Sequence, residues 1–280
     1  MDGAGFYGKL PSHGDFVGRR LPRDFLDVWD NWLQQAVAES KARLGGAWLD
    51  AYLNSPIWRF ALMPGICGDR AYLGLMMPSI DRVGRYFPLT VAAPLEPGVS
   101  ALGSAIAAGS WFDQVEDLLL GVLGEQALTL EEFDAGVETL SSELTPAGRL
   151  SLPTGADAPS VQRQWQLSAP PGASAGLSIC SLVGGVVLDQ VGPLSVWRTG
   201  ADAELPSRYL GTHGMPPPAD YVDMLATDTP AIPADWQHVE ESSPEVFSPP
   251  PEPAPIDPLD PVTIPGGGQP AGGGDTLSLE

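Results

Sequence analysis

Three short apolar runs, at residues 58–63, 71–77 and 87–93, constrain the fold of this chain most. The first two are joined by PGICGDR, a short glycine-containing connection that suits an antiparallel hairpin. The third follows PSIDRVGRY. These runs predict three strands of one sheet, and the same reasoning predicts further strands at residues 6–10, 177–182 and 194–197.

A long helix is expected before the first of these runs. Pro22 suits a first helical turn, and large apolar residues recur at helical spacing from Phe25 to Val37. Gly45 follows as a helix end. A short helix over residues 48–53 comes next, and the aromatic stripe of the long helix is expected to pack on the sheet.

The later part of the chain mixes helical and strand patterns. Residues 102–123 indicate one broken helix or two, with Gly109 near the interruption. Thr129 followed by Glu132 fits a capping box that begins another helix, and residues 220–225 suggest a short last one. Because strands and helices do not alternate strictly, we expect an α/β (α+β) fold: a compact sandwich with a mostly antiparallel sheet flanked by helices.

Composition changes sharply near Trp236. Residues 1–236 have the patterning of one folded domain, whereas residues 237–280 are dominated by proline, glycine and acids. Such a segment buries too little apolar surface to offset its ordering entropy, so we expect a disordered C-terminal tail. Its function as a linker, a weak docking segment or an inert tail stays open.

The formal net charge of −21 excludes several classes of partner. Binding to nucleic acid needs a basic face, and an anionic membrane repels such a chain. Two cysteines are too few for a disulfide framework, and no secretory leader or apolar segment long enough to span a bilayer is evident. We therefore expect a soluble cytoplasmic protein with no nucleic-acid partner and no membrane insertion.

The segment Gly3–Lys9 fits two nucleotide-binding patterns, G-x-G-x-x-G and G-x-x-x-x-G-K. Both require a strand before the glycines, and only Met1 and Asp2 precede Gly3. Leu10 stands where a phosphate-binding loop needs a hydroxyl for Mg²⁺. A nucleotide-binding enzyme is therefore an alternative hypothesis, and a plain strand is favoured.

Ser174 raises a second enzymatic alternative. It lies in GASAG, which fits the G-x-S-x-G pattern of serine hydrolases, and Asp189 and His213 follow in the expected order. The pattern requires a strand before the serine and a helix after it. Here a proline-rich segment precedes it and the apolar run after it resembles a strand, so we expect no catalytic residues.

A polar cluster at residues 79–85 is the best candidate for a binding surface. Asp81, Arg82 and Arg85 could form ion pairs that hold a loop, or could meet an acidic partner. His13 and Asp15 could both donate to a metal, but two ligands make no site, and neither metal nor cofactor is expected. These five residues are the candidate partner-binding residues, with structural and recognition roles both open.

Several motifs taken together resemble one protein family, TagF (also ImpM), which is accessory to bacterial type VI secretion systems. The resemblance is carried by GFYGKLPSHGDFV at 5–17, LPRDFLDVWDNWLQ at 21–34, SPIWRFALMPGICG at 55–68, PSIDRVGRYFPLTV at 78–91 and, more loosely, LSVWRT at 194–199 and GMPPPADYVDML at 214–225. It is dense up to residue 93 and returns near the end of residues 1–236.

This resemblance implies a cytoplasmic, non-enzymatic regulator. It would repress assembly or firing of the secretion apparatus after translation, by binding a forkhead-associated (Fha-type) scaffold protein. In some bacteria a similar domain is fused to a PppA-type phosphatase, which makes such a phosphatase a second possible partner. The resemblance supplies no catalytic residues, and it implies a compact α/β sandwich.

Overall fold

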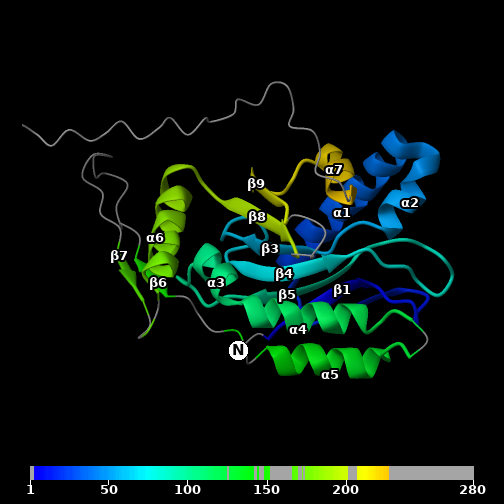
Figure 1. The fold of residues 1–280 in the computed structure, drawn as a ribbon, viewed down its shortest axis with the longest axis horizontal. Coiled ribbons are helices and arrows are strands. Elements are labelled where there is room, and N and C mark those ends of the chain that lie inside the picture. Colours follow the sequence, from blue (N-terminus) through cyan, green and yellow to red (C-terminus); the bar gives the residue numbers. More distant parts are fainter. Residues whose placement is uncertain are drawn as a thin grey trace, which may run out of the picture. The chain divides into compact units, whose positions relative to one another are not determined.

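The computed structural model describes residues 3–124, 126–141, 144, 148–151, 166–169, 172, 174–200 and 207–226. It is built on an antiparallel sheet with the strand order β2-β1-β5-β4-β3-β8-β9 (Figure 1). The seven strands are β1 Gly5–Lys9, β2 Phe16–Arg19, β3 Trp58–Leu62, β4 Tyr72–Met77, β5 Leu89–Pro94, β8 Leu194–Thr199 and β9 Tyr209–His213. Two short strands, β6 Arg149–Ser151 and β7 Gln166–Ser168, form a separate ribbon.

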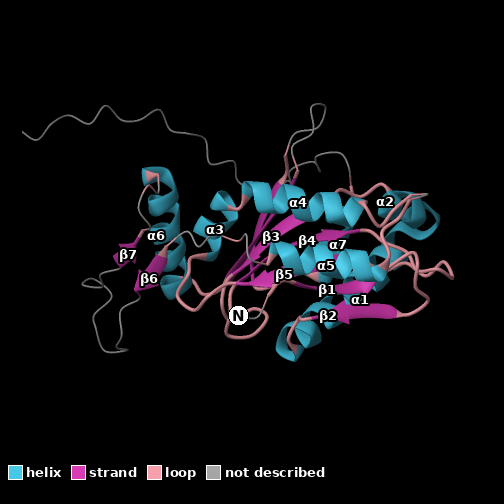
Figure 2. Ribbon diagram, turned by 90° about the horizontal axis from the view of Figure 1, so that it is seen from below, coloured by secondary structure: helices cyan, strands magenta, loops and turns pink. Residues whose placement is uncertain are grey.

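Helices cover both faces of the sheet, as the fold class predicts. The helices are α1 Arg23–Leu44, α2 Trp48–Leu53, α3 Ala101–Ala107, α4 Gly109–Leu120, α5 Leu130–Leu140, α6 Ala175–Gln190 and α7 Tyr221–Leu225, with single 3₁₀ turns at η1 Gly45–Ala47 and η3 Pro218–Asp220. In Figure 1, α1 and α7 lie above the sheet, and α4 and α5 lie below it. Figure 2 views the molecule from the side of α4 and α5, with the strands behind them. The α+β sandwich is confirmed.

The side-chain alternation of the strands creates two cores. Phe60 of β3 faces α1, and its neighbour Ala61 faces the α4 side. The upper core is strongly aromatic: Trp29 of α1 packs on Phe60 and Trp197, with ring centroids 4.7 and 5.8 Å away. The indole Nε1 of Trp29 donates to Thr90 Oγ1 at 3.0 Å, so this ring is buried without an unpaired donor.

Most of the predicted elements are confirmed, with shifted ends. The runs at 58–63, 71–77 and 87–93 became β3, β4 and β5, and β3 and β4 form the predicted antiparallel hairpin. The break near Gly109 separates α3 from α4. The capping box also forms: the Glu132 amide donates to Thr129 Oγ1, and the Thr129 amide donates to the Glu132 carboxylate.

The strand predicted at residues 177–182 is wrong, because this segment belongs to α6. Ser174 caps the helix by accepting a hydrogen bond from the Leu177 amide at 3.2 Å. The apolar residues of this run are spread around the helix, with Ser178 and Ser181 between them, so they show little helical period. Its buried side is made of small residues, including Gly184, against which Leu102 of α3 packs.

Two strands of the sheet, β2 and β9, were not predicted. Neither FVGR nor YLGTH has enough apolar residues to look like a strand, and pairing with β1 and β8 makes them strands. The tail at 237–280 and the domain end at residue 236 lie outside the described residues and stay predictions.

The glycines of the first motif are required by sheet packing. Gly5 and Gly8 both lie in β1, between β2 and β5. A Cβ at Gly8 would stand 2.2 Å from the Pro88 carbonyl oxygen, and the φ of Gly8 is 143°. A Cβ at Gly5 would stand 2.4 Å from the Arg19 carbonyl oxygen. Only glycine allows the backbones to approach this closely.

We therefore expect Gly8→Ala to lower the free energy of unfolding by about 3 kcal/mol, because the added methyl meets backbone that cannot move aside. Gly46→Ala is the matched control: apart from its own stretch of chain, no atom lies within 4 Å of its ideal Cβ. Its effect should stay within about 0.5 kcal/mol. Urea denaturation of both variants tests this, and a wild-type stability for Gly8→Ala would contradict it.

Candidate functional site

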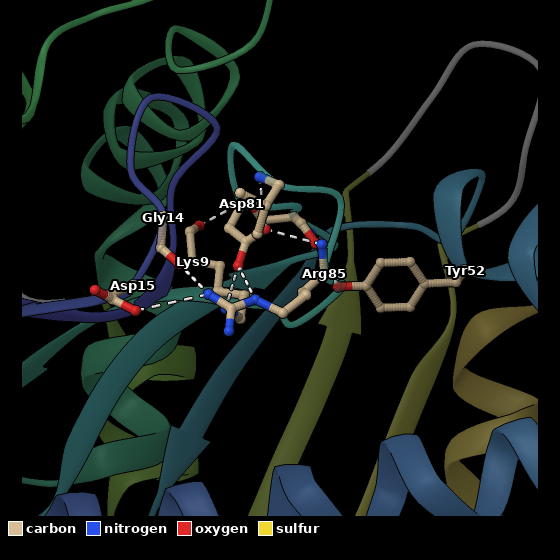
Figure 3. A network of polar contacts seen from close by, with 8 residues as sticks. Lys9, Gly14, Asp15, Tyr52, Asp81 and Arg85 are labelled. Atoms are coloured by element: carbon tan, nitrogen blue, oxygen red, sulfur yellow. Dashed lines mark hydrogen bonds and ion pairs between the residues drawn. The ribbon is translucent and has the colours of Figure 1, made fainter.

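The candidate site is built by two loops at one end of the sheet. Residues 10–15 connect β1 to β2, and residues 78–88 connect β4 to β5. Because β1 and β5 are neighbouring strands, the two loops lie side by side. The Arg82 amide donates to the His13 carbonyl oxygen at 2.9 Å, and the Arg85 guanidinium donates to the Gly14 carbonyl (Figure 3). We call the surface they share the two-loop surface.

The buried carboxylate of Asp81 holds this arrangement together (Figure 3). Its Oδ1 accepts hydrogen bonds from the amides of Val83 at 3.0 Å and Arg85 at 2.8 Å. Its Oδ2 accepts from Lys9 Nζ at 2.5 Å and from Arg85 Nε at 2.7 Å. Asp81 thereby closes its own loop and ties it to β1.

The charge of Asp81 is stabilised by these donors. Burial alone raises the pKa of a carboxyl group. Hydrogen bonds from Lys9, from the Arg85 amide and guanidinium and from the Val83 amide outweigh burial and hold the pKa of Asp81 well below its usual range. The pairing also raises the pKa of Arg85. Asp81 is therefore a buried anion with hydrogen-bond donors at both of its carboxylate oxygens.

Ser79 and Tyr52 connect the same loop to the helices. Ser79 Oγ donates to the Lys9 carbonyl oxygen at 2.7 Å. The Tyr52 hydroxyl of α2 donates to the Ser79 carbonyl oxygen at 2.9 Å and accepts from the Ser79 amide at 3.0 Å. Burial raises the pKa of Tyr52 well above its ordinary value, so the hydroxyl stays a donor. The loop therefore has fixed anchors on both sides.

The outer side of the two-loop surface offers groups suited to binding. Arg82 is exposed and makes no ion pair or side-chain hydrogen bond with any residue in the described ranges. Val83 beside it is 66% exposed. Phe16 is 46% exposed, with its ring stacked on Tyr7 at 5.5 Å and Lys9 Nζ 4.5 Å from its centroid. An unpaired cation beside apolar side chains is typical of a protein-binding surface.

The five candidate residues lie close together in the structure, but they differ in their contacts and in their exposure. Asp81 and Arg85 hold the loops, which favours the structural role for this pair. Arg82 points to no described partner and remains open for recognition. Asp15 is fully exposed, 3.6 Å from Arg85, and the His13 ring nitrogen Nδ1 lies 2.9 Å from Ser12 Oγ.

Sequence reasoning missed four contributors: Lys9, Tyr52, Phe16 and Val83. Lys9 was considered only as the lysine of a phosphate-binding motif, and its carboxylate partner lies 72 residues away. Phe16 stands between a polar loop and Val17 in the sequence. This local pattern does not show whether the ring is exposed or buried in the core.

The described residues do not have the arrangement that either enzymatic alternative requires. The backbone of Gly5–Lys9 is a paired strand rather than a loop open to phosphate, and Lys9 Nζ binds Asp81. Ser174 and Asp189 lie at opposite ends of α6, about 22 Å apart at 1.5 Å per residue. The three residues of the proposed triad therefore do not meet.

The described residues contain neither a cluster of metal-binding side chains nor a membrane-crossing helix. Within the ranges given above, no three of the His, Cys, Asp and Glu side chains are grouped so that they could hold a metal ion. None of the described helices combines the length and the apolar character needed to cross a membrane.

Replacement of the buried anion tests its role. Asp81→Asn should lower the Tm at pH 7 by roughly 5–10 °C, because Lys9 and Arg85 lose their shared partner. The folded pKa lies below the unfolded one, so this stabilisation is present above about pH 4 and is lost as the pH falls further. The Tm gap between wild type and variant should therefore narrow between pH 5 and pH 2.

Asp15→Asn is the control, because its carboxylate is fully exposed. It should change the Tm by less than about 2 °C at any of these pH values. A gap for Asp81→Asn that is the same at pH 3 and pH 7 would contradict the proposed charge state of Asp81.

Comparisons with known proteins identify the family. A sequence model described as the TagF N-terminal domain, type VI secretion system-associated, matches residues 5–140. Among solved structures, PA0076 from Pseudomonas aeruginosa PAO1 is 36% identical, with a TM-score of 0.64; the match covers 82% of this chain and 97% of that one. A comparison with curated proteins finds no match. The chain belongs to the TagF family of type VI secretion-associated proteins.

Proposed function

We propose that this chain is a non-enzymatic, cytoplasmic regulator that represses assembly or firing of a type VI secretion system after translation. It does so by binding an Fha-type scaffold protein through the two-loop surface. The observation that carries the proposal is the family match over residues 5–140, a range that includes both loops and every residue of the Asp81 network.

The chemistry of the two-loop surface supports an acidic partner. The chain carries a net charge of −21, yet this surface presents Arg82 and Arg85 at its rim. Arg85 is partly neutralised by Asp81 and Asp15, which leaves Arg82 as the free cation. Opposite charge on the partner would steer association and fix its orientation. Val83 and Phe16 would supply the apolar contact.

The rigidity of the surface supports binding. Asp81, Ser79 and Tyr52 fix the backbone of residues 79–85 before any partner arrives. A surface held in its bound conformation loses less entropy on association. A PppA-type phosphatase is the second partner to test, because a domain of that kind is fused to a TagF-like domain in some bacteria.

Charge reversal at Arg82 tests the proposal. Arg82→Glu should weaken binding to the purified Fha-type scaffold of the same cell by about tenfold or more, because it places like charge at the contact. Its Tm should stay within about 2 °C of wild type, since no described group is bonded to the Arg82 side chain and its backbone hydrogen bond is unchanged. Isothermal titration calorimetry and thermal scans provide the two measurements.

Arg149→Glu is the matched control, with the same charge change on an exposed residue of β6. It should leave scaffold binding within about twofold of wild type. Arg85→Glu should lower both affinity and Tm, because it also disturbs Asp81. Unchanged binding by Arg82→Glu, or failure of the wild-type chain to bind the scaffold, would refute the proposed function.

A further inference from the structure

The outer side of α6 carries an exposed apolar stripe. Ile179 is 62% exposed and Val183 is 53% exposed, and Val186 on the same side is partly exposed. Because these three residues are four and three positions apart, they lie in one row along the helix, which we call the α6 stripe. Leu182 and Val187, both partly exposed, flank it. Large apolar side chains exposed together are typical of a surface that contacts another protein.

The opposite side of α6 is the one that the fold uses. Ser181, Gly184 and Gly185 are buried there. Leu102 of α3 packs on Gly184, since an ideal Cβ at this glycine would stand 3.2 Å from the leucine Cδ1. In Figure 1, α6 lies at one end of the molecule, beside α3. The small residues of α6 therefore hold it against the domain, and its larger residues in the α6 stripe face outward.

The spacing of the α6 stripe suits contact with another helix. Alternating steps of four and three residues are those of the core positions in a coiled coil. With 16 residues, α6 is about 24 Å long, or roughly two heptads. Isolated helices of this length are marginal in water, but α6 is already packed on α3, so a partner need not order it. A short and reversible contact between two helices is therefore expected.

The charge distribution favours a second copy of the chain as the partner. Residues 175–188 include no charged residue, although the chain has a net charge of −21. Two copies of so acidic a chain repel each other most where carboxylates would face carboxylates, and least across an uncharged surface. A two-fold contact brings the same patch of both copies together, so the patch must be complementary to itself. An uncharged apolar stripe meets this requirement.

We propose that the α6 stripe packs against the α6 stripe of a second copy of this chain, which forms a two-fold symmetric dimer. Ile179, Val183 and Val186 make the core of the contact, and Leu182 and Val187 make its edges. Val183 lies near the middle of the stripe, so it meets Val183 of the second copy whether the helices run parallel or antiparallel. The proposal goes beyond the proposed function and is independent of it, because α6 lies outside the two-loop surface.

Sedimentation velocity of the full chain, under reducing conditions, tests the dimer. The chain should pass from monomer toward dimer between about 1 and 200 μM, the range expected of a small interface. Val183→Lys should raise the dimer Kd by about tenfold or more, because it places two cations against each other. Leu53→Lys, on a residue of α2 that is 52% exposed, is the matched control and should change the Kd by less than about twofold. Both lysines change the net charge equally, so the difference reports the contact itself.

Disulfide cross-linking locates the contact without relying on a disruptive variant. Cys180→Ser removes the exposed cysteine, and the remaining Cys67 is buried. In this background, Val183→Cys should form a cross-linked dimer with the oxidant diamide about tenfold faster than Leu53→Cys, because a disulfide needs the two Cα atoms within about 7 Å. Non-reducing electrophoresis measures both rates, and a thermal scan shows whether each variant keeps the wild-type Tm.

Three outcomes would overturn the proposal. A monomer at every concentration up to about 200 μM would mean that another protein, or another segment of this chain, occupies the α6 stripe. A dimer with the same response to Val183→Lys and Leu53→Lys would mean that the copies meet elsewhere. Equal cross-linking rates for Val183→Cys and Leu53→Cys would mean that the α6 helices do not face each other. None of these results would bear on scaffold binding by the two-loop surface.

Discussion

The buried ion pairs of Asp81 are the interaction on which the candidate site depends. One carboxylate receives donors from β1, through Lys9, and from its own loop, through Arg85 and two backbone amides. A charge in this position is tolerated only because all its partners are present. The same contacts place Arg82 and Val83 outward without fixing their side chains. The contacts of Asp81 therefore determine both the stability of the two loops and the shape of the two-loop surface.

Local patterns predicted the central fold well, because its elements carry strong local signals. The stripe from Phe25 to Val37 forms the buried side of α1, and Thr129 with Glu132 begins α5. Where local signal was weak, prediction failed. FVGR in β2 becomes a strand only by pairing with β1, and the mostly apolar residues of α6 show little helical period. In both segments, tertiary contacts rather than local sequence determine the secondary structure.

The candidate site was partly predictable for the same reason. The dense polar cluster at 79–85 indicated Asp81, Arg82 and Arg85, but its pattern could not divide them between structural and recognition roles. That division needs Lys9, which is distant in sequence and contributes the buried cation. The glycines of the first motif suggested nucleotide binding and instead permit close strand packing at Gly5 and Gly8.

We propose that the Fha-type scaffold binds at the two-loop surface. Hydrogen–deuterium exchange of the chain, with and without the purified Fha-type scaffold, tests it directly. We expect slower exchange on complex formation in residues 12–18 and 79–86, with α4 and α5 unchanged. Scaffold-induced protection confined to other elements, with both loops unaffected in a saturated complex, would contradict it.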